Sequence, residues 1–256
     1  MSAATVPGRL SGRRALLTGA AGGMGRTVAE RFLAEGATVV LTDLPGPRLD
    51  ETLAAVEGRG GVHALPADLR DESAVRALVD GAAEALGGLD VIYNNAGVRF
   101  GDRDGGVDTI DLEVWETTLA VNVTGTFLVC KHAIPHLLRE RDPVIVNVAS
   151  MAGLGGDVFA HAYSASKGAM LALTKSMAHR WGPDGLRAVA ICPGMIDTEM
   201  LSPVKAGADT DELTATTALR RLGRPEEIAG VAAFLASSDA SFVTASFVEV
   251  HGGLAK

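Results

Sequence analysis

The sequence predicts an α/β fold in which seven parallel strands form one doubly wound sheet with helices on both faces. Short β-branched runs alternate along the chain with amphipathic stretches. The stretches at 24–35, 72–86 and 163–181 are long enough for right-handed crossovers between parallel strands. The expected strands are Arg14–Thr18, Thr38–Thr42, Val62–Pro66, Leu89–Tyr93, Val144–Val148, Leu186–Cys192 and Phe247–Val250.

The chain length predicts a single domain over residues 1–256, because one core suffices for a chain of this size. No internal repeat or low-complexity linker divides it. The irregular regions are the N-terminus, Phe100–Thr109 and Met195–Arg220. Loops of that length usually serve a binding site.

The charge balance favours a small-molecule ligand. The chain has 23 Lys and Arg against 31 Asp and Glu, a net charge of −8. This balance argues against nucleic acid or an anionic membrane as the main partner. No run of 18 apolar residues and no apolar signal core near Met1 is present, so we expect neither membrane insertion nor export.

The two cysteines, Cys130 and Cys192, lie far apart in apolar contexts. We expect buried thiols rather than a disulfide or a metal site, which fits the reducing cytoplasm. The sequence predicts no metal centre.

A glycine-rich turn from Thr18 to Gly25, TGAAGGMG, joins the first expected strand to a helix. In this context backbone amides can approach a pyrophosphate. Asp43 ends the second strand, where a carboxylate can bond the adenosine ribose and repel a 2′-phosphate. Neither Gly22 nor Leu44 supplies a cation for that phosphate, so we expect NAD rather than NADP. The alternatives are a turn without a ligand and Asp43 as a turn former before Pro45.

Two further turns follow strand ends, where doubly wound sheets bind ligands. Asp68 follows the third strand, and Asn94-Asn95-Ala96-Gly97 follows the fourth. We expect both at the cofactor edge, with Asn94 the stronger candidate. Either could instead cap a helix or close a turn.

Four residues supply a catalytic mechanism. Tyr163 and Lys167 are four apart on a helix and so share a face. A phenol of ordinary pKa near 10 is a poor base at neutral pH, so Lys167 and an oxidised nicotinamide must lower that pKa. Ser150, at the end of a buried strand, can donate to the substrate oxygen, and Asn122 could hold a water between Lys167 and solvent.

In this order TGxxxGxG, Asp43, NNAG, Asn122, Ser150, YxxxK and Cys192-Pro193-Gly194 resemble the short-chain dehydrogenase/reductase family over essentially the whole chain. The resemblance implies a Rossmann sheet, Tyr163 as general acid/base and Lys167 on the nicotinamide ribose. It also implies nicotinamide contacts from the Pro193–Thr198 segment. The residues expected at the cofactor are Gly19, Gly22, Gly23, Met24, Gly25, Asp43, Leu44, Asp68, Leu69, Asn95, Ala96, Gly97, Tyr163, Lys167, Pro193, Gly194, Ile196 and Thr198.

This sequence departs from the family pattern at two positions. Ala149 stands where many members have a second Ser, and His251 replaces the Asp of a terminal VDGG. Neither change removes a mechanistic group.

By the same resemblance, substrate contacts come from three segments, the last a lid over about 195–220. They predict a mainly apolar cavity for a small cyclic, terpenoid, steroid-like or polyketide-like alcohol or ketone. About half of the candidates should be core filler instead. We expect Arg99 and Arg103 to be solvated rather than to bind an acidic substrate. The candidates, with Ser150, are Phe100, Met151, Leu154, Val158, Phe159, His161, Met195, Met200 and Leu201.

The sequence therefore predicts an NAD-dependent alcohol dehydrogenase or ketoreductase, with the oxidative direction favoured by Asp43. The alternatives are a 3-oxoacyl-carrier-protein reductase, a non-redox relative and an NAD-sensing protein without activity. The carrier-protein reading is weakened by the net charge and by His179 where an Arg is expected. Apolar residues on helices 111–140 and 163–181 imply, by resemblance, a homotetramer, unless they all pack on the sheet.

Overall fold

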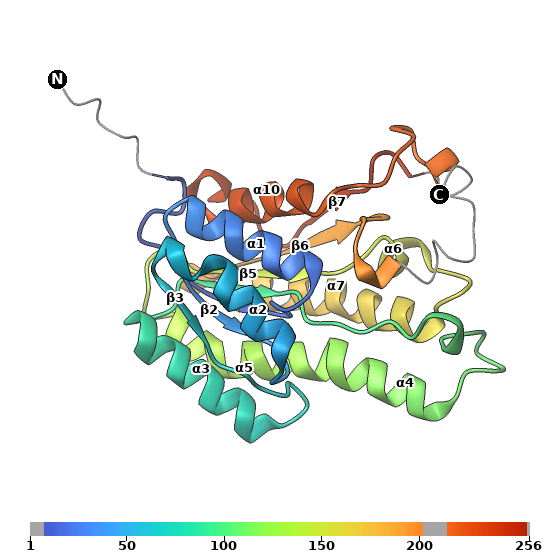
Figure 1. The fold of residues 1–256 in the computed structure, drawn as a ribbon, viewed down its shortest axis with the longest axis horizontal. Helices are drawn as coiled ribbons and strands as arrows, with labels where there is room; N and C mark the ends of the chain where they lie inside the picture. Colours follow the sequence, from blue (N-terminus) through green and yellow to red (C-terminus); the bar gives the residue numbers. More distant parts are fainter. Residues whose placement is uncertain (1–7, 202–213, 255–256) are drawn as a thin grey trace.

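Seven strands form one parallel sheet in the order β3-β2-β1-β4-β5-β6-β7 in the computed structural model (Figure 1). The structure describes residues 8–201 and 214–254. The doubly wound Rossmann fold and its seven strands are thus confirmed. The strands are β1 (Arg14–Thr18), β2 (Thr38–Thr42), β3 (Val62–Ala64), β4 (Val91–Asn94), β5 (Val144–Val148), β6 (Arg187–Pro193) and β7 (Phe247–Val250).

Helices cover both faces of the sheet (Figure 1). One face packs against α1, α2 and α10, and the other against α3, α5 and α7. The helices are α1 (Gly23–Ala34), α2 (Pro47–Val56), α3 (Glu72–Leu86), α4 (Leu112–Leu119), α5 (Thr126–Leu137), α6 (Ala152–Gly155), α7 (His161–Trp181) and α10 (Pro225–Ala236).

Alternation along each strand divides the core. In β1, Ala15 and Leu17 join the α1 and α10 side, whereas Leu16 joins the α3 and α5 side. Because both faces are covered, the central residues of the strands are mostly apolar, as expected of a parallel sheet. Cys130 and Cys192 are free and buried, as predicted.

Strand ends differ from the sequence predictions by a few residues. The third strand stops at Ala64 rather than Pro66, since Pro cannot donate to the ladder. Among the described residues, no helix is long and apolar enough to cross a membrane. The predicted lid, 195–220, lies partly outside the described residues.

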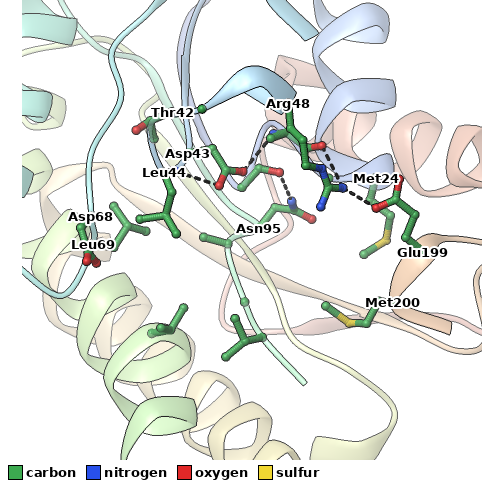
Figure 2. A pocket seen from close by; sticks show the side chains of 18 of the residues that line it. Met24, Thr42, Asp43, Leu44, Arg48, Asp68, Leu69, Asn95, Glu199 and Met200 are labelled. Carbon is green, nitrogen blue, oxygen red and sulfur yellow. Dashed lines mark hydrogen bonds and ion pairs between the residues drawn. The ribbon is translucent and has the colours of Figure 1, made fainter. Parts of the chain in front are cut away.

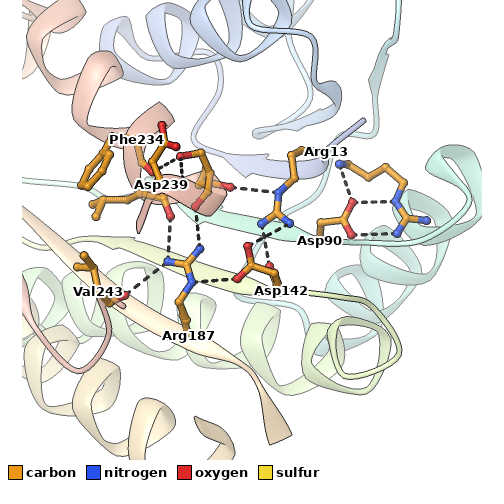
Figure 3. Close-up of polar contacts among 11 residues, drawn as sticks. Arg13, Asp90, Asp142, Arg187, Phe234, Asp239 and Val243 are labelled. Carbon is orange, nitrogen blue, oxygen red and sulfur yellow. Dashed lines mark hydrogen bonds and ion pairs between the residues drawn. The ribbon is translucent and has the colours of Figure 1, made fainter. Parts of the chain in front are cut away.

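A buried polar network lies at the amino ends of the strands (Figure 3). The guanidinium of Arg187, at the start of β6, bonds the Asp142 carboxylate at 3.2 Å. It also donates to the carbonyls of Leu235 at 3.1 Å and Ser237 at 3.2 Å, in the last turn of α10 and directly after it. The side chain is 6% exposed, so these bonds replace its hydration. Arg187 therefore ties α10 to β6.

Replacing Arg187 by Met should lower the free energy of unfolding by about 3 kcal/mol, because it leaves the Leu235 and Ser237 carbonyls without this donor and Asp142 with only Arg13, 3.9 Å away. The affinity for the expected coenzyme should not change, since the network lies at the amino ends of the strands and the glycine-rich turn lies at their carboxyl ends. Denaturant titration and coenzyme titration measure the two effects. Arg221→Met, which breaks the exposed pair with Glu227, is the control and should be far milder. An equal loss in both variants would contradict this account.

Candidate active site

A cavity of about 870 Å³ lies at the carboxyl ends of β1, β2 and β4 (Figure 2). Strands β2 and β4 lie on opposite sides of β1, so the strand order reverses at this point. Doubly wound sheets bind ligands at such a position. The volume suits a dinucleotide-sized ligand. The expected cofactor residues that line it are Gly19, Gly22, Gly23, Met24, Asp43, Leu44, Asp68, Leu69, Asn95, Ala96, Gly97 and Thr198.

The glycine-rich turn is shaped for close approach to a ligand. Gly19 has φ +66°, and a Cβ there would lie 2.7 Å from the backbone of Ala96, so only glycine fits. Helix α1 then begins at Gly23 without a side-chain cap and without an acid in its first turn. Its first amides are therefore available to an anion, as a pyrophosphate requires.

The turn after β4 is bonded to the end of β1. The Thr18 hydroxyl accepts the amides of Asn95 at 3.1 Å and Ala96 at 3.2 Å. The Asn95 side chain donates to the Gly19 carbonyl at 2.9 Å. Its Oδ1, like the Thr42 hydroxyl on the same cavity wall, is buried without a hydrogen-bond partner among the described residues. Such atoms fit a polar ligand better than an empty wall.

The Asp43 carboxylate is held at the end of β2 (Figure 2). Its Oδ2 accepts the Ala21 amide at 2.9 Å, and its Oδ1 accepts the Leu44 amide at 2.8 Å. Asp43 therefore joins β2 to the glycine-rich turn. Two charge-assisted bonds fix the carboxylate in the cavity wall, where a ribose could bond it.

Arg48, near the start of α2, is a cation in this wall that the sequence argument missed. It pairs with Glu199 across the cavity mouth (Figure 2). The available signal was the position of Arg48, five residues beyond Asp43 and second in the next helix.

Asp68 lies in the wall, as expected, but its charge is already engaged. Arg70 bonds both carboxylate oxygens, with its Nε at 3.0 and 3.1 Å. This contact holds the pKa of Asp68 below its usual range. Asp68 therefore offers a ligand an acceptor that it shares with Arg70.

Asn94 does not line the cavity. Its Nδ2 donates to Asn147 at 2.9 Å, and Asn147 donates to Thr174 of α7 at 2.8 Å. All three are buried. The expectation of a cofactor contact from Asn94 is wrong, because Asn94 is the last residue of β4 and its side chain points into the sheet core rather than the turn. It links β4 and β5 to α7.

The catalytic candidates meet where α7 passes the end of β5. The Tyr163 hydroxyl shares a hydrogen bond with the Ser150 side chain. The Lys167 amine lies 5.6 Å from the centre of the Tyr163 ring and donates to the Val148 carbonyl at 2.7 Å. The helix thus presents both residues on one face, as their spacing predicts.

Burial changes the acidity of both groups. It raises the pKa of Tyr163, and the Ser150 hydrogen bond and the nearby Arg99 charge oppose that rise. It lowers the pKa of Lys167 to about 8. A buried group favours its neutral form, so the Tyr163 phenol is a weaker acid and the Lys167 ammonium a stronger acid than in water. Ser150 and Arg99 oppose the rise in the Tyr163 pKa, and Lys167 is not among its causes, so the lowering of this pKa that we expected from Lys167 is not seen.

Gly97 separates these groups from the cavity. A Cβ on Gly97 would lie 3.3 Å from Asn122 Oδ1 and 3.4 Å from Lys167 Nζ. Asn122, Ser150, Tyr163 and Lys167 themselves are not among the lining residues. The catalytic groups therefore lie directly behind one wall of the cavity.

Asn122 fixes that wall. A π-helical turn, Ala120–Gly125, interrupts the helix here, as is common at functional sites. In the Asn122 side chain, Oδ1 accepts the Val98 N–H at 2.8 Å. Its Nδ2 donates to the Val98 carbonyl at 3.1 Å and to the Ser166 hydroxyl at 3.0 Å. These bonds use both N–H donors of the side chain, and the water relay that we expected stays a prediction.

Asp104 positions the catalytic helix. Its carboxylate accepts the amides of Ala162 at 2.8 Å and Tyr163 at 2.9 Å, and it is fully buried. Ala160, which precedes the helix, provides no side-chain cap. Asp104 thus caps α7 from a distant loop, a role that sequence analysis missed because the loop looks polar and exposed.

Comparison with known proteins decides the family. A family model described as enoyl-(acyl carrier protein) reductase matches residues 19–255. The meso-2,3-butanediol dehydrogenase of Serratia marcescens is 40% identical, covering 96% of this chain and 95% of its own. The protein belongs to the short-chain dehydrogenase/reductase family.

Two further relatives agree. The 3-oxoacyl-[acyl-carrier-protein] reductase FabG of Thermotoga maritima is 34% identical, over 96% of this chain and 99% of its own. A crystal structure of a short-chain dehydrogenase/reductase from Brucella melitensis, titled glucose/ribitol dehydrogenase, superposes with a TM-score of 0.90. It shares 35% identity over 98% of this chain and all of that one. The protein is an oxidoreductase of this family.

Only part of the segment expected at the nicotinamide lies in the cavity wall. Thr198 lines the cavity, whereas Pro193, Gly194 and Ile196 do not. Ile196 is buried beside Gly223. Gly25 is likewise buried within α1.

The expected substrate residues divide into two groups. Phe100 and Met200 line the cavity. Met151 is buried in a small core with Met170, and Phe159 is 75% exposed. His161, the first residue of α7, has a buried Nδ1 without a partner among the described residues, and Met195 does not line the cavity. Of all the substrate candidates named from the sequence, only Phe100 and Met200 therefore line the cavity.

The expectation that Arg99 is solvated is wrong. Arg103 is exposed, as expected, but the Arg99 side chain is only 14% exposed and lines the cavity. It lies close to Asp157, 3.5 Å away. The bond between Asn122 and Val98 draws this part of the loop inward, which local polarity could not reveal.

The Lys167 burial predicts a pH-dependent stability. The pKa of Lys167 falls from 10.5 to about 8 on folding, so between these values the unfolded chain binds more protons and the free energy of unfolding rises with pH. Relative to Lys167→Met, the ligand-free wild type should gain up to about 3 kcal/mol between neutral pH and pH 10.5. Denaturant titrations across this range measure the gain. Lys175→Met, on an exposed position of the same helix, is the control. A difference between wild type and Lys167→Met that does not vary with pH would contradict the burial of an ammonium.

Proposed function

We propose that this protein is an NAD-dependent alcohol dehydrogenase that interconverts a small secondary alcohol and a ketone. The observation that carries the proposal is the placement of Tyr163, Ser150 and Lys167 behind the wall at Gly97. That wall belongs to a cavity with an uncapped helix terminus and a fixed carboxylate. Together these features provide both a dinucleotide site and an acid/base group beside it.

In the proposed reaction the Tyr163 hydroxyl exchanges a proton with the substrate oxygen. The bound nicotinamide supplies the chemistry that the chain lacks, by accepting or donating a hydride. During oxidation Tyr163 Oη takes the hydroxyl proton while Ser150 orients the same oxygen. Lys167 stabilises the phenolate by its charge, and the buried surroundings strengthen that interaction.

The coenzyme assignment rests on Asp43. Its carboxylate can accept ribose hydroxyls and repels a 2′-phosphate. Arg48 could attract that phosphate, but in the wild type the Asp43 carboxylate repels it and Glu199 already pairs with Arg48. NAD is therefore the proposed coenzyme, and oxidation the proposed direction.

We further propose a cytoplasmic homotetramer acting on a mainly apolar substrate. Phe100, Val121 and Met200 supply apolar wall at the substrate end of the cavity. Phe127 on α5 is an exposed apolar side chain suited to a subunit contact.

A reductase acting on carrier-bound 3-oxoacyl groups is the second candidate. Such an enzyme would be expected to present basic residues near the end of α7, and Arg180 is exposed there. The net charge of −8 opposes an acidic carrier. Faster turnover of a 3-oxoacyl thioester than of any simple alcohol would favour this candidate.

Changing Asp43 to Ser should shift the NAD to NADP ratio of kcat/KM at least ~10-fold toward NADP, because it removes a charged hydrogen-bond acceptor and leaves Arg48. NADH and NADPH formation with a panel of secondary and cyclic alcohols measures the ratio. Asp50→Ser, on an exposed position of α2, is the control. Adding Arg48→Ala should remove the gain. An unchanged ratio in Asp43→Ser would refute the coenzyme assignment.

Changing Tyr163 to Phe should reduce kcat by ~100-fold or more while NADH still binds, because only the proton-transfer group is lost. The sequence has one other tyrosine, Tyr93, whose buried hydroxyl has no partner among the described residues. Tyr93→Phe is therefore a matched control that should remain active. Turnover by Tyr163→Phe near the wild-type rate would exclude the acid/base role.

A further inference from the structure

Arg99 is a partly buried cation with few partners. Its side chain is 14% exposed, and its guanidinium carries five N–H donors. Among the described residues it makes one side-chain hydrogen bond, to Asp157 Oδ2 at 3.5 Å. A guanidinium removed from water needs partners for its donors. Since Arg99 also lines the cavity, a ligand in the cavity can supply them.

Asp157 is the acceptor on the other side. It lies in the loop between α6 and α7, where its backbone N–H donates to Ser164 at 2.9 Å. Its Oδ1 accepts the Phe159 amide at 2.9 Å. Only Oδ2 faces Arg99. The start of α7 therefore fixes this oxygen in place.

Both charges are anchored near the first turn of α7, which carries Tyr163. Asp157 bonds Ser164, the residue after Tyr163, and Arg99 pairs with Asp157. Arg99 follows Val98, which Asn122 holds through two hydrogen bonds. Their charges have opposite effects on the pKa of Tyr163.

We propose that Arg99 and Asp157 form a polar subsite for a second oxygen of the substrate, so that the preferred substrates are neutral diols and the corresponding hydroxyketones. This inference rests on the proposed alcohol dehydrogenase function. A hydroxyl can accept from Arg99 and donate to Asp157 at once. A carboxylate would pair with Arg99 but face the charge of Asp157, so the geometry favours a neutral group.

Matched substrates isolate the second oxygen. We would measure kcat/KM with NAD for 2,3-butanediol against 2-butanol, 1,2-cyclohexanediol against cyclohexanol, and 3-hydroxybutyrate as an anionic comparison. The wild type should prefer each diol over its mono-alcohol by at least ~10-fold, the effect of a hydrogen bond to a charged partner. It should not prefer the hydroxy acid.

Arg99→Met and Asp157→Asn should each reduce that preference at least several-fold. The ratio is the readout, because any change in Tyr163 acidity affects both members of a pair equally. Arg99→Lys keeps the charge without the planar fork and should retain part of the preference. Arg103→Met changes an exposed arginine on the same loop and should leave the ratio unchanged.

Loss of the diol preference in Arg99→Met with mono-alcohols still oxidised would support the subsite. A wild type that turns over diols and mono-alcohols equally, or that prefers the hydroxy acid, would overturn it while leaving the proposed function intact. If no alcohol is oxidised although NADH binds, the proposed function fails, and the subsite fails with it.

Discussion

The hydrogen bonds between the ends of β1 and β4 are the contact on which the rest of the site depends. Thr18 accepts two amides from the turn after β4, and Asn95 returns a bond to Gly19. These bonds hold two turns together at the point where the sheet order reverses. One turn presents the start of α1 to the cavity, and the other carries Gly97 against the catalytic groups. One set of side-chain-to-backbone hydrogen bonds therefore sets the distance between the proposed dinucleotide site and the proposed acid/base residues.

Catalytic competence is built at some cost to stability. Lys167 is almost completely buried and donates to one backbone carbonyl, so its ammonium form is destabilised. A purely structural position would carry an apolar residue. Asp104 fixes the first turn of α7, and Asn122 fixes the loop that carries Arg99. The reacting groups can thus be held rigidly although several of them come from loops.

Periodicity was enough to predict the fold, because a parallel sheet covered on both faces has continuous apolar strands separated by long helices. Asp43 could be anticipated because it directly follows a strand, and the Tyr163–Lys167 pair because its members are about one helical turn apart. Asn94 and Asn95 are adjacent, yet only Asn95 reaches the cavity, since alternate residues of an extended chain point to opposite sides. Arg48, Asp104 and Asp157 escaped prediction because their partners lie more than 50 residues away in sequence.

The central claim is that one cavity brings a dinucleotide to the Tyr163 side of Gly97. A crystal structure of the protein with NADH tests it most directly. The account predicts adenosine ribose hydroxyls on Asp43, pyrophosphate at the start of α1 and the nicotinamide beside Gly97, within reach of Tyr163. A nucleotide bound away from Asp43, or a nicotinamide separated from Tyr163 by a closed wall, would contradict it.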